Sequence, residues 1–205
     1  MQYLEFVLFG NTYHIYNRGI NGCDLFREKE NYDYFLGLYD KHISSIADTY
    51  AWVLMKNHFH LLVKIKDESK IQNLASNSPD RVPNPVRAED PSRHFSNLFN
   101  SYAQAFNKRF GRHGNLFERP FKRKLISGIE DYKRLVVYIH NNPVHHGFTK
   151  YAMDYQWSSY LTCISVKPTH LQRDAVTGWF GSETNFKKAH DNHEDETDLE
   201  NWLGL

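Results

Sequence analysis

Hydrophobic and polar residues follow two different periods along the chain, and the changes of period divide it into predicted strands and helices. Four stretches have the β-rich composition or the alternation typical of strands: Phe6–Arg18, Asp48–Lys56, His58–Ile65 and Leu116–Ile126. Gly19 and Gly22 predict a turn after the first strand. The short break at Lys56 and Asn57 predicts an antiparallel hairpin between the second and third strands, and Pro120 favours an edge position or a bulge in the fourth.

Three further stretches place apolar side chains at helical spacing: Glu28–Ile46, Ser92–Phe110 and Ile129–Asn142. Gly111 follows the second stretch, as expected at a helix C-terminus, and Pro143 predicts the end of the third. Residues 67–91 are polar and contain four prolines, which predicts a mobile insertion with a short helical piece near Lys70–Leu74. Scattered apolar residues beyond residue 150 predict short helices.

The predicted elements follow the order β-α-β-β-α-β, with one further helix behind them. This order is typical of the ferredoxin-like arrangement, in which an antiparallel sheet carries two helices on one face. We therefore expect an α+β protein with one such domain in residues 1–150, interrupted by the insertion at 67–91. Residues 151–205 are expected to form a C-terminal helical extension that ends in an acidic tail.

The composition of the 205-residue chain is that of a globular protein, with 40% hydrophobic and 15% aromatic residues. No basic run opens the chain and no apolar stretch is long enough to cross a bilayer, so we expect a soluble, cytoplasmic protein without membrane contact. Cys23 and Cys163 lie far apart and form no C-x-x-C pattern, which argues against a disulfide framework and a thiolate metal site.

The net charge of +1 hides an uneven distribution. Residues 101–150 contain ten Lys or Arg against three Asp or Glu, and residues 181–205 contain two against seven. A basic middle favours a polyanionic partner, although solvated protein faces carry charge in any case. Charge alone weighs these two interpretations about equally.

Two histidines one residue apart are the first candidate site. His58 and His60 lie in a predicted strand, where side chains two apart project from the same face. Two neutral imidazoles at one spot suit a divalent metal. For an isolated H-x-H pattern, however, two polar residues on the wet face of a strand are the commoner explanation.

A tyrosine and an asparagine on the third predicted helix are the second candidate. Tyr138 and Asn142 are four residues apart, so they lie on the same face, flanking the apolar stripe at the edge of the core. A tyrosine hydroxyl beside a metal can attack a phosphodiester and hold the cut strand covalently. The Asn142 amide could complete the coordination of Mg²⁺ or Mn²⁺. Taken alone, a core-boundary tyrosine and a helix-end asparagine before a proline are the favoured explanation of the pair.

Five stretches together resemble the single-tyrosine HUH transposases of the IS200 type, most of all their REP-associated tyrosine transposase branch. They occur in family order over about residues 12–162: YHIYNRG at 13–19, MKNHFHLLV at 55–63, SYAQAFNKRFGRHGNLFERPFK at 101–122, YIHNNPVHHGF at 138–148 and WSSY at 157–160. The resemblance implies that residues 1–150 are a catalytic domain for metal-dependent nicking and strand transfer of DNA through a covalent 5′-phosphotyrosine.

The same resemblance assigns a role to each candidate residue. His58 and His60 match the metal ligands of the HUH motif, and Tyr138 matches the nucleophile. Asn142 matches the position of a third polar ligand, which is often Gln in related transposases, and His140 and His145 lie near it. The family's usual Met-Pro-Asn-His reads Met-Lys-Asn-His at 55–58, which changes the turn and keeps the ligand set.

The implied substrate is single-stranded DNA that carries hairpins of repetitive extragenic palindromes. Six basic residues are candidates for phosphate contacts: Arg18, Arg112, Arg119, Lys122, Arg123 and Lys124. Four aromatic residues could stack on unpaired bases, although core packing explains each of them at least as well: Tyr13, Tyr16, Phe117 and Phe121. The acidic tail is either a solvated extension, which we favour, or a segment that covers the basic groove and competes with DNA.

Two other functions fit part of the pattern. A domesticated relative could bind hairpin DNA or RNA without cutting it, but such a protein has no need for the two histidines, Tyr138 and Asn142 together. A small-molecule phosphohydrolase would leave the basic middle without a purpose. The palindrome bound and the metal used in the cell are not determined by the sequence, and both a monomer and a homodimer are compatible with the resemblance.

Overall fold

The structure, a computed structural model, describes residues 6–71, 90–191 and 201–203. Four strands form one antiparallel sheet in the order β2-β3-β1-β4. Their bounds are β1 (Thr12–Arg18), β2 (Ala47–Leu54), β3 (His58–Ile65) and β4 (Lys122–Ile126). The predicted α+β class and the ferredoxin-like order are therefore confirmed.

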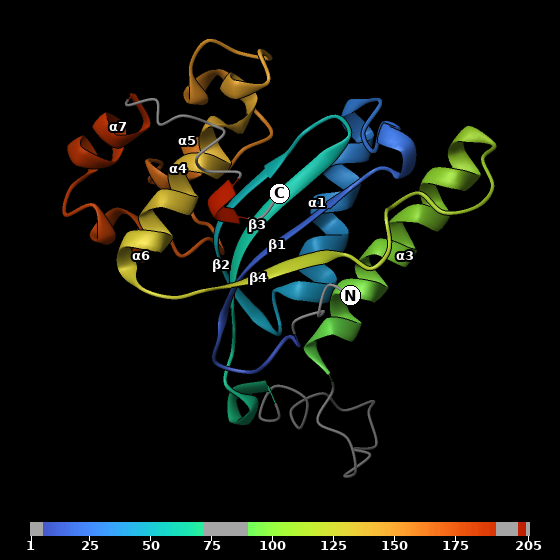
Figure 1. Ribbon diagram of the computed structural model, residues 1–205, viewed down its shortest axis with the longest axis horizontal. Coiled ribbons are helices and arrows are strands. Elements are labelled where there is room, and N and C mark those ends of the chain that lie inside the picture. Colours follow the sequence, from blue (N-terminus) through green and yellow to red (C-terminus); the bar gives the residue numbers. More distant parts are fainter. Residues whose placement is uncertain (1–5, 72–89, 192–200, 204–205) are drawn as a thin grey trace.

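Helices cover both faces of this sheet (Figure 1). The helices and 3-10 turns are η1 (Ile20–Gly22), α1 (Lys29–Ile43), α3 (Pro91–Phe110), α4 (Ile129–His145), η2 (Ala152–Asp154), α5 (Tyr160–Cys163), α6 (Arg173–Trp179) and α7 (Glu183–Asp191). The first two α-helices, α1 and α3, lie on one face, and α4 lies on the other with the C-terminal helices. Within the described residues, no helix is both long and apolar enough to span a membrane.

Strand alternation divides the core into two layers. Ile15 of β1 and Phe59 of β3 pack under α1 and α3, together with Phe35 and Phe99. Leu62 of β3 points the other way and joins the apolar face of α4. Because side chains alternate across a strand, the same alternation places His14, Tyr16, His58 and His60 on the face that α4 covers.

Two predicted strands are shorter than expected. Residues 6–11 lie outside β1, because the chain turns at Gly10, which has a positive φ of 76°. Residues 116–121 make only an isolated bridge, between Phe117 and Gly19, and β4 begins after Pro120, which has no N–H for a ladder. Residues 68–71 form one helical turn, whereas 72–89 and the acidic stretch 192–200 lie outside the described residues.

The prediction that Pro143 ends the third helix is wrong. Helix α4 continues to His145 with Pro143 in its last turn. Proline there removes one hydrogen bond to the Ile139 carbonyl and no more, because the helix ends within a few residues. The carbonyls of Asn142 and Pro143 in turn accept hydrogen bonds from the N–H groups of His146 (3.1 Å) and Phe148 (2.8 Å). Asn142 consequently keeps its helical place one turn below Tyr138.

The C-terminal extension covers the outer edge of the sheet. Residues 157–159 and 171–172 pair with the outer edge of β2; for example, Gln172 N–H donates to the Thr49 carbonyl at 2.8 Å. Exposed strand edges invite pairing with other chains. Here the chain's own backbone occupies the edge of β2.

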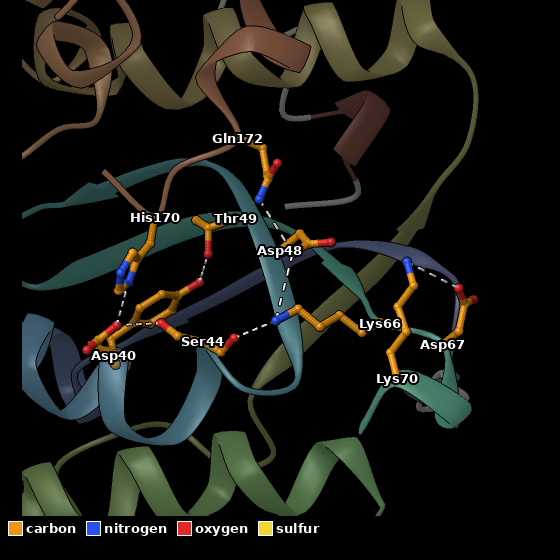
Figure 2. A network of polar contacts seen from close by, with 10 residues as sticks. Asp40, Ser44, Asp48, Thr49, Lys66, Asp67, Lys70, His170 and Gln172 are labelled. Carbon is orange, nitrogen blue, oxygen red and sulfur yellow. Dashed lines mark hydrogen bonds and ion pairs between the residues drawn. The ribbon is translucent and has the colours of Figure 1, made fainter. Parts of the chain in front are cut away.

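Polar side chains add to this attachment (Figure 2). The His170 ring lies 3.0 Å from the Asp40 carboxylate, and Gln172 donates to Asp48 at 3.5 Å. Lys66 also faces Asp48, at 3.9 Å. Because contacts this exposed contribute only about 0–1 kcal/mol each, the buried apolar residues of the extension provide most of the attachment.

Candidate active site

The turn between β2 and β3 sets the position of His58. Met55 N–H donates to the His58 carbonyl at 2.8 Å, which closes the hairpin directly before the first histidine. The end of β1 holds this turn, because Gly19 N–H donates to the Asn57 carbonyl at 2.8 Å. A side chain at position 19 would place its Cβ 1.9 Å from the Cys23 carbonyl oxygen, so this approach requires glycine.

The strand register gathers the histidines with residues of β1. His60 lies opposite Tyr16, and His58 lies opposite Arg18. The His58 and His60 rings are nearly perpendicular, at 80°, with centroids 5.2 Å apart. The expected projection of both imidazoles from one face is thus observed, and that face points toward α4.

Helix α4 brings Tyr138 and Asn142 to the same place. The Tyr138 ring lies edge-on to His60, with 5.4 Å between centroids, and Asn142 Oδ1 is 2.9 Å from His58 Nε2. The structure therefore brings together all four residues that the sequence singled out. Their expected position at the edge of the core is wrong: Tyr138 is 2% and Asn142 0% exposed, because both lie on the side of α4 that packs against the sheet.

Both ring nitrogens of His58 face a side-chain oxygen, which can accept a hydrogen bond but cannot donate one. Its Nδ1 faces Asn57 Oδ1 at 2.8 Å and its Nε2 faces Asn142 Oδ1 at 2.9 Å, yet a neutral imidazole has a single N–H. One of these contacts therefore pairs two lone pairs. Rotating the Asn142 amide relieves this, and so does a cation that accepts both lone pairs. The Asn142 Nδ2 is buried and has no hydrogen-bond partner among the described residues.

His14 is a site residue that the sequence did not identify. Its Nε2 lies 2.9 Å from His60 Nδ1, and its side chain is completely buried. When His60 donates this hydrogen bond, its Nε2 lone pair faces the cavity. Partners that orient a metal-binding imidazole in this way are common. The only signal in the sequence was the position of His14 on the same strand face as Tyr16.

Burial keeps the imidazoles of the site neutral. It lowers the pKa of His58 to about 4, although the hydrogen bond with Asn142 raises it. Burial and then the neighbouring His14 hold the pKa of His60 well below its ordinary value. For His14, burial and the charge of Lys124 lower the pKa to about 3. Neutral imidazoles present the lone pairs that a divalent cation requires.

A cavity of about 570 Å³ opens in front of these groups. The lining includes His58, His60 and Tyr138, and other segments contribute, among others, Arg18 at the end of β1, Lys122 at the start of β4 and Phe148 after α4. Both basic side chains can contact phosphate, and the half-exposed Phe148 ring can pack on a base. This volume falls within the range of ligand-binding pockets in proteins.

The two alternative ligands near Asn142 behave differently. His140 points away from the cavity into a buried chain of hydrogen bonds: His190 Nδ1 donates to the Phe186 carbonyl (2.7 Å), His140 Nδ1 donates to His190 Nε2 (2.9 Å), and Ser159 Oγ donates to His140 Nε2 (2.8 Å). Because the Phe186 carbonyl can only accept a hydrogen bond, it fixes which atom carries the proton in each hydrogen bond of this series. The His145 ring lies 6.4 Å from the Tyr138 ring.

We expect the stability of the protein to fall with acid through His190. Burial lowers its pKa to about 4, against the smaller raising effects of the Phe186 carbonyl and Asp191. His190 in the unfolded chain takes up a proton below pH 6.5, whereas in the folded chain it stays neutral down to about pH 4. Its contribution to the free energy of unfolding is therefore fully present above pH 6.5 and is lost on acidification. At pH 5 the loss is about 2 kcal/mol.

Urea unfolding at pH 7 and pH 5 measures this effect against the variant His190→Gln, whose amide oxygen can still accept from His140. The variant should be less stable at pH 7 and should lose less free energy of unfolding between the two values. Equal losses in both proteins would contradict the role of His190.

The six basic candidates divide between different places. Arg18 and Lys122 line the cavity, and Arg18 faces Glu118 at 3.6 Å. Lys124 donates to the Trp202 carbonyl and lies 5.2 Å from its ring. Alternation along β4 puts Arg123 on the opposite face of the sheet, where it lines a separate groove with Arg119.

Several residues that the sequence predicted to contact DNA make contacts within the protein. The guanidinium of Arg112 donates to Asn107 at 3.1 Å and lies 5.9 Å from the Phe106 ring, and it lines neither the cavity nor the groove as described. Tyr13, Phe117 and Phe121 are buried in the core between the sheet and α3. Core packing is thus the correct interpretation for these three aromatic side chains.

Neither a scan of protein-family models nor a search of curated proteins matches the chain. Among solved structures, the chain is similar to a REP-associated tyrosine transposase bound to a REP hairpin, with a TM-score of 0.56 and 18% identity. The similarity covers 82% of this chain and 88% of the other. At this identity it shows a shared fold, which confirms the fold that the sequence resemblance implied.

Proposed function

We propose that this protein is a metal-dependent tyrosine transposase that nicks and rejoins single-stranded DNA next to a hairpin. The observation that carries the proposal is the meeting of His58, His60, Tyr138 and Asn142 at one place, beside a cavity that the first three of them line. These residues come from two segments about 80 positions apart, and the sequence resemblance gives each of them a role in one reaction. The fold shared with a hairpin-bound transposase supports the same reaction.

Tyr138 is proposed as the nucleophile. Its hydroxyl oxygen would form a bond to the scissile phosphorus, and the bond between phosphorus and the preceding 3′ oxygen would break. The hydroxyl proton is lost and the leaving 3′ oxygen takes one up, so the step is neutral in protons. Arg18 and Lys122 line the cavity and would hold the phosphates on either side of the cut.

The donor atoms at the site fit a divalent cation, either Mg²⁺ or Mn²⁺. His58 Nε2, His60 and Asn142 Oδ1 would hold it, and the approach of His58 Nε2 to Asn142 Oδ1 at 2.9 Å supports this occupant. When bound, the cation would polarise a non-bridging phosphoryl oxygen and orient the phosphate. The described residues include no group of three His, Cys, Asp or Glu placed for a metal, and we propose the neutral amide of Asn142 as the third ligand.

The test is incubation of the protein with labelled single-stranded hairpin oligonucleotides and Mn²⁺, followed by denaturing electrophoresis. A covalent protein–DNA adduct that depends on the metal and on the unpaired flank supports the proposal. A fully paired duplex of the same sequence is the control and should give no adduct. Tight hairpin binding without any adduct would instead identify a hairpin-binding protein that does not cut.

A further inference from the structure

A second tyrosine, Tyr16, lines the cavity in front of Tyr138, and the proposed reaction leaves it without a role. It lies in the middle of β1, the strand between β3 and β4. Tyr13 of the same strand is buried in the core, whereas Tyr16 is only half-buried. Its side chain lies on the face of the sheet that carries the histidines, because it pairs with His60.

The strand register places three polar side chains in one row across this face. Tyr16 pairs with His60 of β3 on one side and with Lys122 of β4 on the other. Because neighbouring strands lie about 4.8 Å apart, the backbones at His60 and Lys122 are separated by about 10 Å across Tyr16. The Tyr16 side chain therefore lies between a proposed metal ligand and a cation that can hold a phosphate.

Stacked rings hold the Tyr16 side chain in place. The Tyr16 ring stacks on His14, with centroids 4.6 Å apart and planes at 23°, and on His60, at 5.8 Å and 22°. His14 is completely buried and its Nε2 lies 2.9 Å from His60 Nδ1, so the stack rests on a fixed base. A phenol ring supported in this way keeps its hydroxyl group in one position, as a preorganised hydrogen-bond donor requires.

The hydroxyl group of Tyr16 has no hydrogen-bond partner among the residues that the structure describes. Other half-buried tyrosines use theirs within the protein. The Tyr39 hydroxyl lies 2.7 Å from Thr49 Oγ1, and the Tyr155 hydroxyl donates to the Leu54 carbonyl at 2.8 Å. A phenol can donate one hydrogen bond and accept others. The O–H of Tyr16 is therefore available to a ligand in the cavity.

We propose that Tyr16 is a further catalytic residue, which donates a hydrogen bond to a non-bridging oxygen of the scissile phosphate. This inference rests on the proposed function. When Tyr138 attacks the phosphorus, negative charge builds up on the non-bridging oxygens, and a donor already held beside them lowers the barrier. Tyr16 keeps its proton and forms no bond to the DNA, so Tyr138 remains the nucleophile.

The experiment compares the wild type with Tyr16→Phe, which keeps the ring stacked on His14 and removes only the hydroxyl group. The rate of adduct formation is measured with Mn²⁺ and a saturating hairpin oligonucleotide, so that differences in affinity do not enter. Kd for the hairpin without metal and Mn²⁺ binding by electron paramagnetic resonance are measured separately. The matched control is Tyr50→Phe, a half-buried tyrosine of β2 that packs on Trp179 outside the lining of the cavity.

Tyr16→Phe should form the adduct about 100-fold more slowly than the wild type, with unchanged affinity for the hairpin and for Mn²⁺. Tyr50→Phe should match the wild type in all three measurements. Adduct formation by Tyr16→Phe at the wild-type rate overturns the inference and leaves the proposed function intact. Loss of Mn²⁺ affinity in Tyr16→Phe, or a wild-type adduct attached to Tyr16 itself, also overturns it. A wild type that forms no adduct overturns both.

Replacing each non-bridging oxygen of the scissile phosphate with sulfur, one at a time, tests the contact itself. Sulfur accepts hydrogen bonds weakly, so with one of the two phosphorothioate isomers the wild type should already lack the contact with Tyr16. On that isomer Tyr16→Phe should slow adduct formation far less than on the other. An equal effect of Tyr16→Phe on both isomers and on the normal phosphate would overturn the inference.

Discussion

Replacing Tyr138 with phenylalanine should abolish the covalent adduct while the protein still binds hairpin DNA. The substitution removes only the hydroxyl oxygen that would attack the phosphorus, and the ring keeps its edge-on contact with His60. Loss of a nucleophile typically lowers the rate by at least about 1000-fold. Adduct formation is measured by denaturing electrophoresis, and binding by fluorescence anisotropy with the same oligonucleotide.

Tyr151→Phe is the matched control for this prediction. Tyr151 is 51% exposed and lies outside the lining of the Tyr138 cavity. The control should form the adduct at the wild-type rate. If Tyr138→Phe still forms an adduct on a tyrosine, then another residue is the nucleophile and the proposed role of Tyr138 is wrong.

Replacing His58 with alanine should remove both metal binding and adduct formation. Removing a residue that hydrogen-bonds to a metal ligand weakens metal binding by about 10- to 100-fold, and removing the ligand itself should weaken it at least as much. Binding of Mn²⁺ is measured directly by electron paramagnetic resonance, without DNA. The affinity of the variant for hairpin DNA in the absence of metal should change little.

His170→Ala is the control, because His170 is an exposed imidazole in the network that attaches the extension (Figure 2). It should bind Mn²⁺ as the wild type does. Unchanged Mn²⁺ binding by His58→Ala would show that His58 and Asn142 do not form a metal site. Removal of metal with a chelator should stop adduct formation in every active variant.

Local patterns in the sequence were sufficient to predict the strands and helices and the two pairs of residues that make up the candidate site. Alternation placed His58 and His60 on one face of a strand, and helical spacing placed Tyr138 above Asn142. Both rules depend on residues close in the chain. The order of the elements then indicated the ferredoxin-like sheet, and the structure confirms it.

Errors arose where hydrogen bonds or packing outside the pattern itself override a local signal. Pro143 is a strong local stop, yet α4 continues, because the carbonyls of its last turn accept hydrogen bonds from the residues that follow. Leu116–Ile126 has a strand-like composition, yet its first half packs aromatic rings against α3 and leaves the ladder. In both cases the packing of the chain outweighs a preference of a few residues.

The sequence by itself determined the periodicities, the strand and helix order and the identities of the four candidate residues. The tertiary structure alone decided which of them touch, how His14 pairs with His60, and which face of the sheet Lys122 and Arg123 each lie on. It also decided that Tyr138 and Asn142 are buried, because their side of α4 packs against the sheet. The physical reason is that backbone periodicity is local, whereas burial and side-chain pairing depend on segments far apart in the chain.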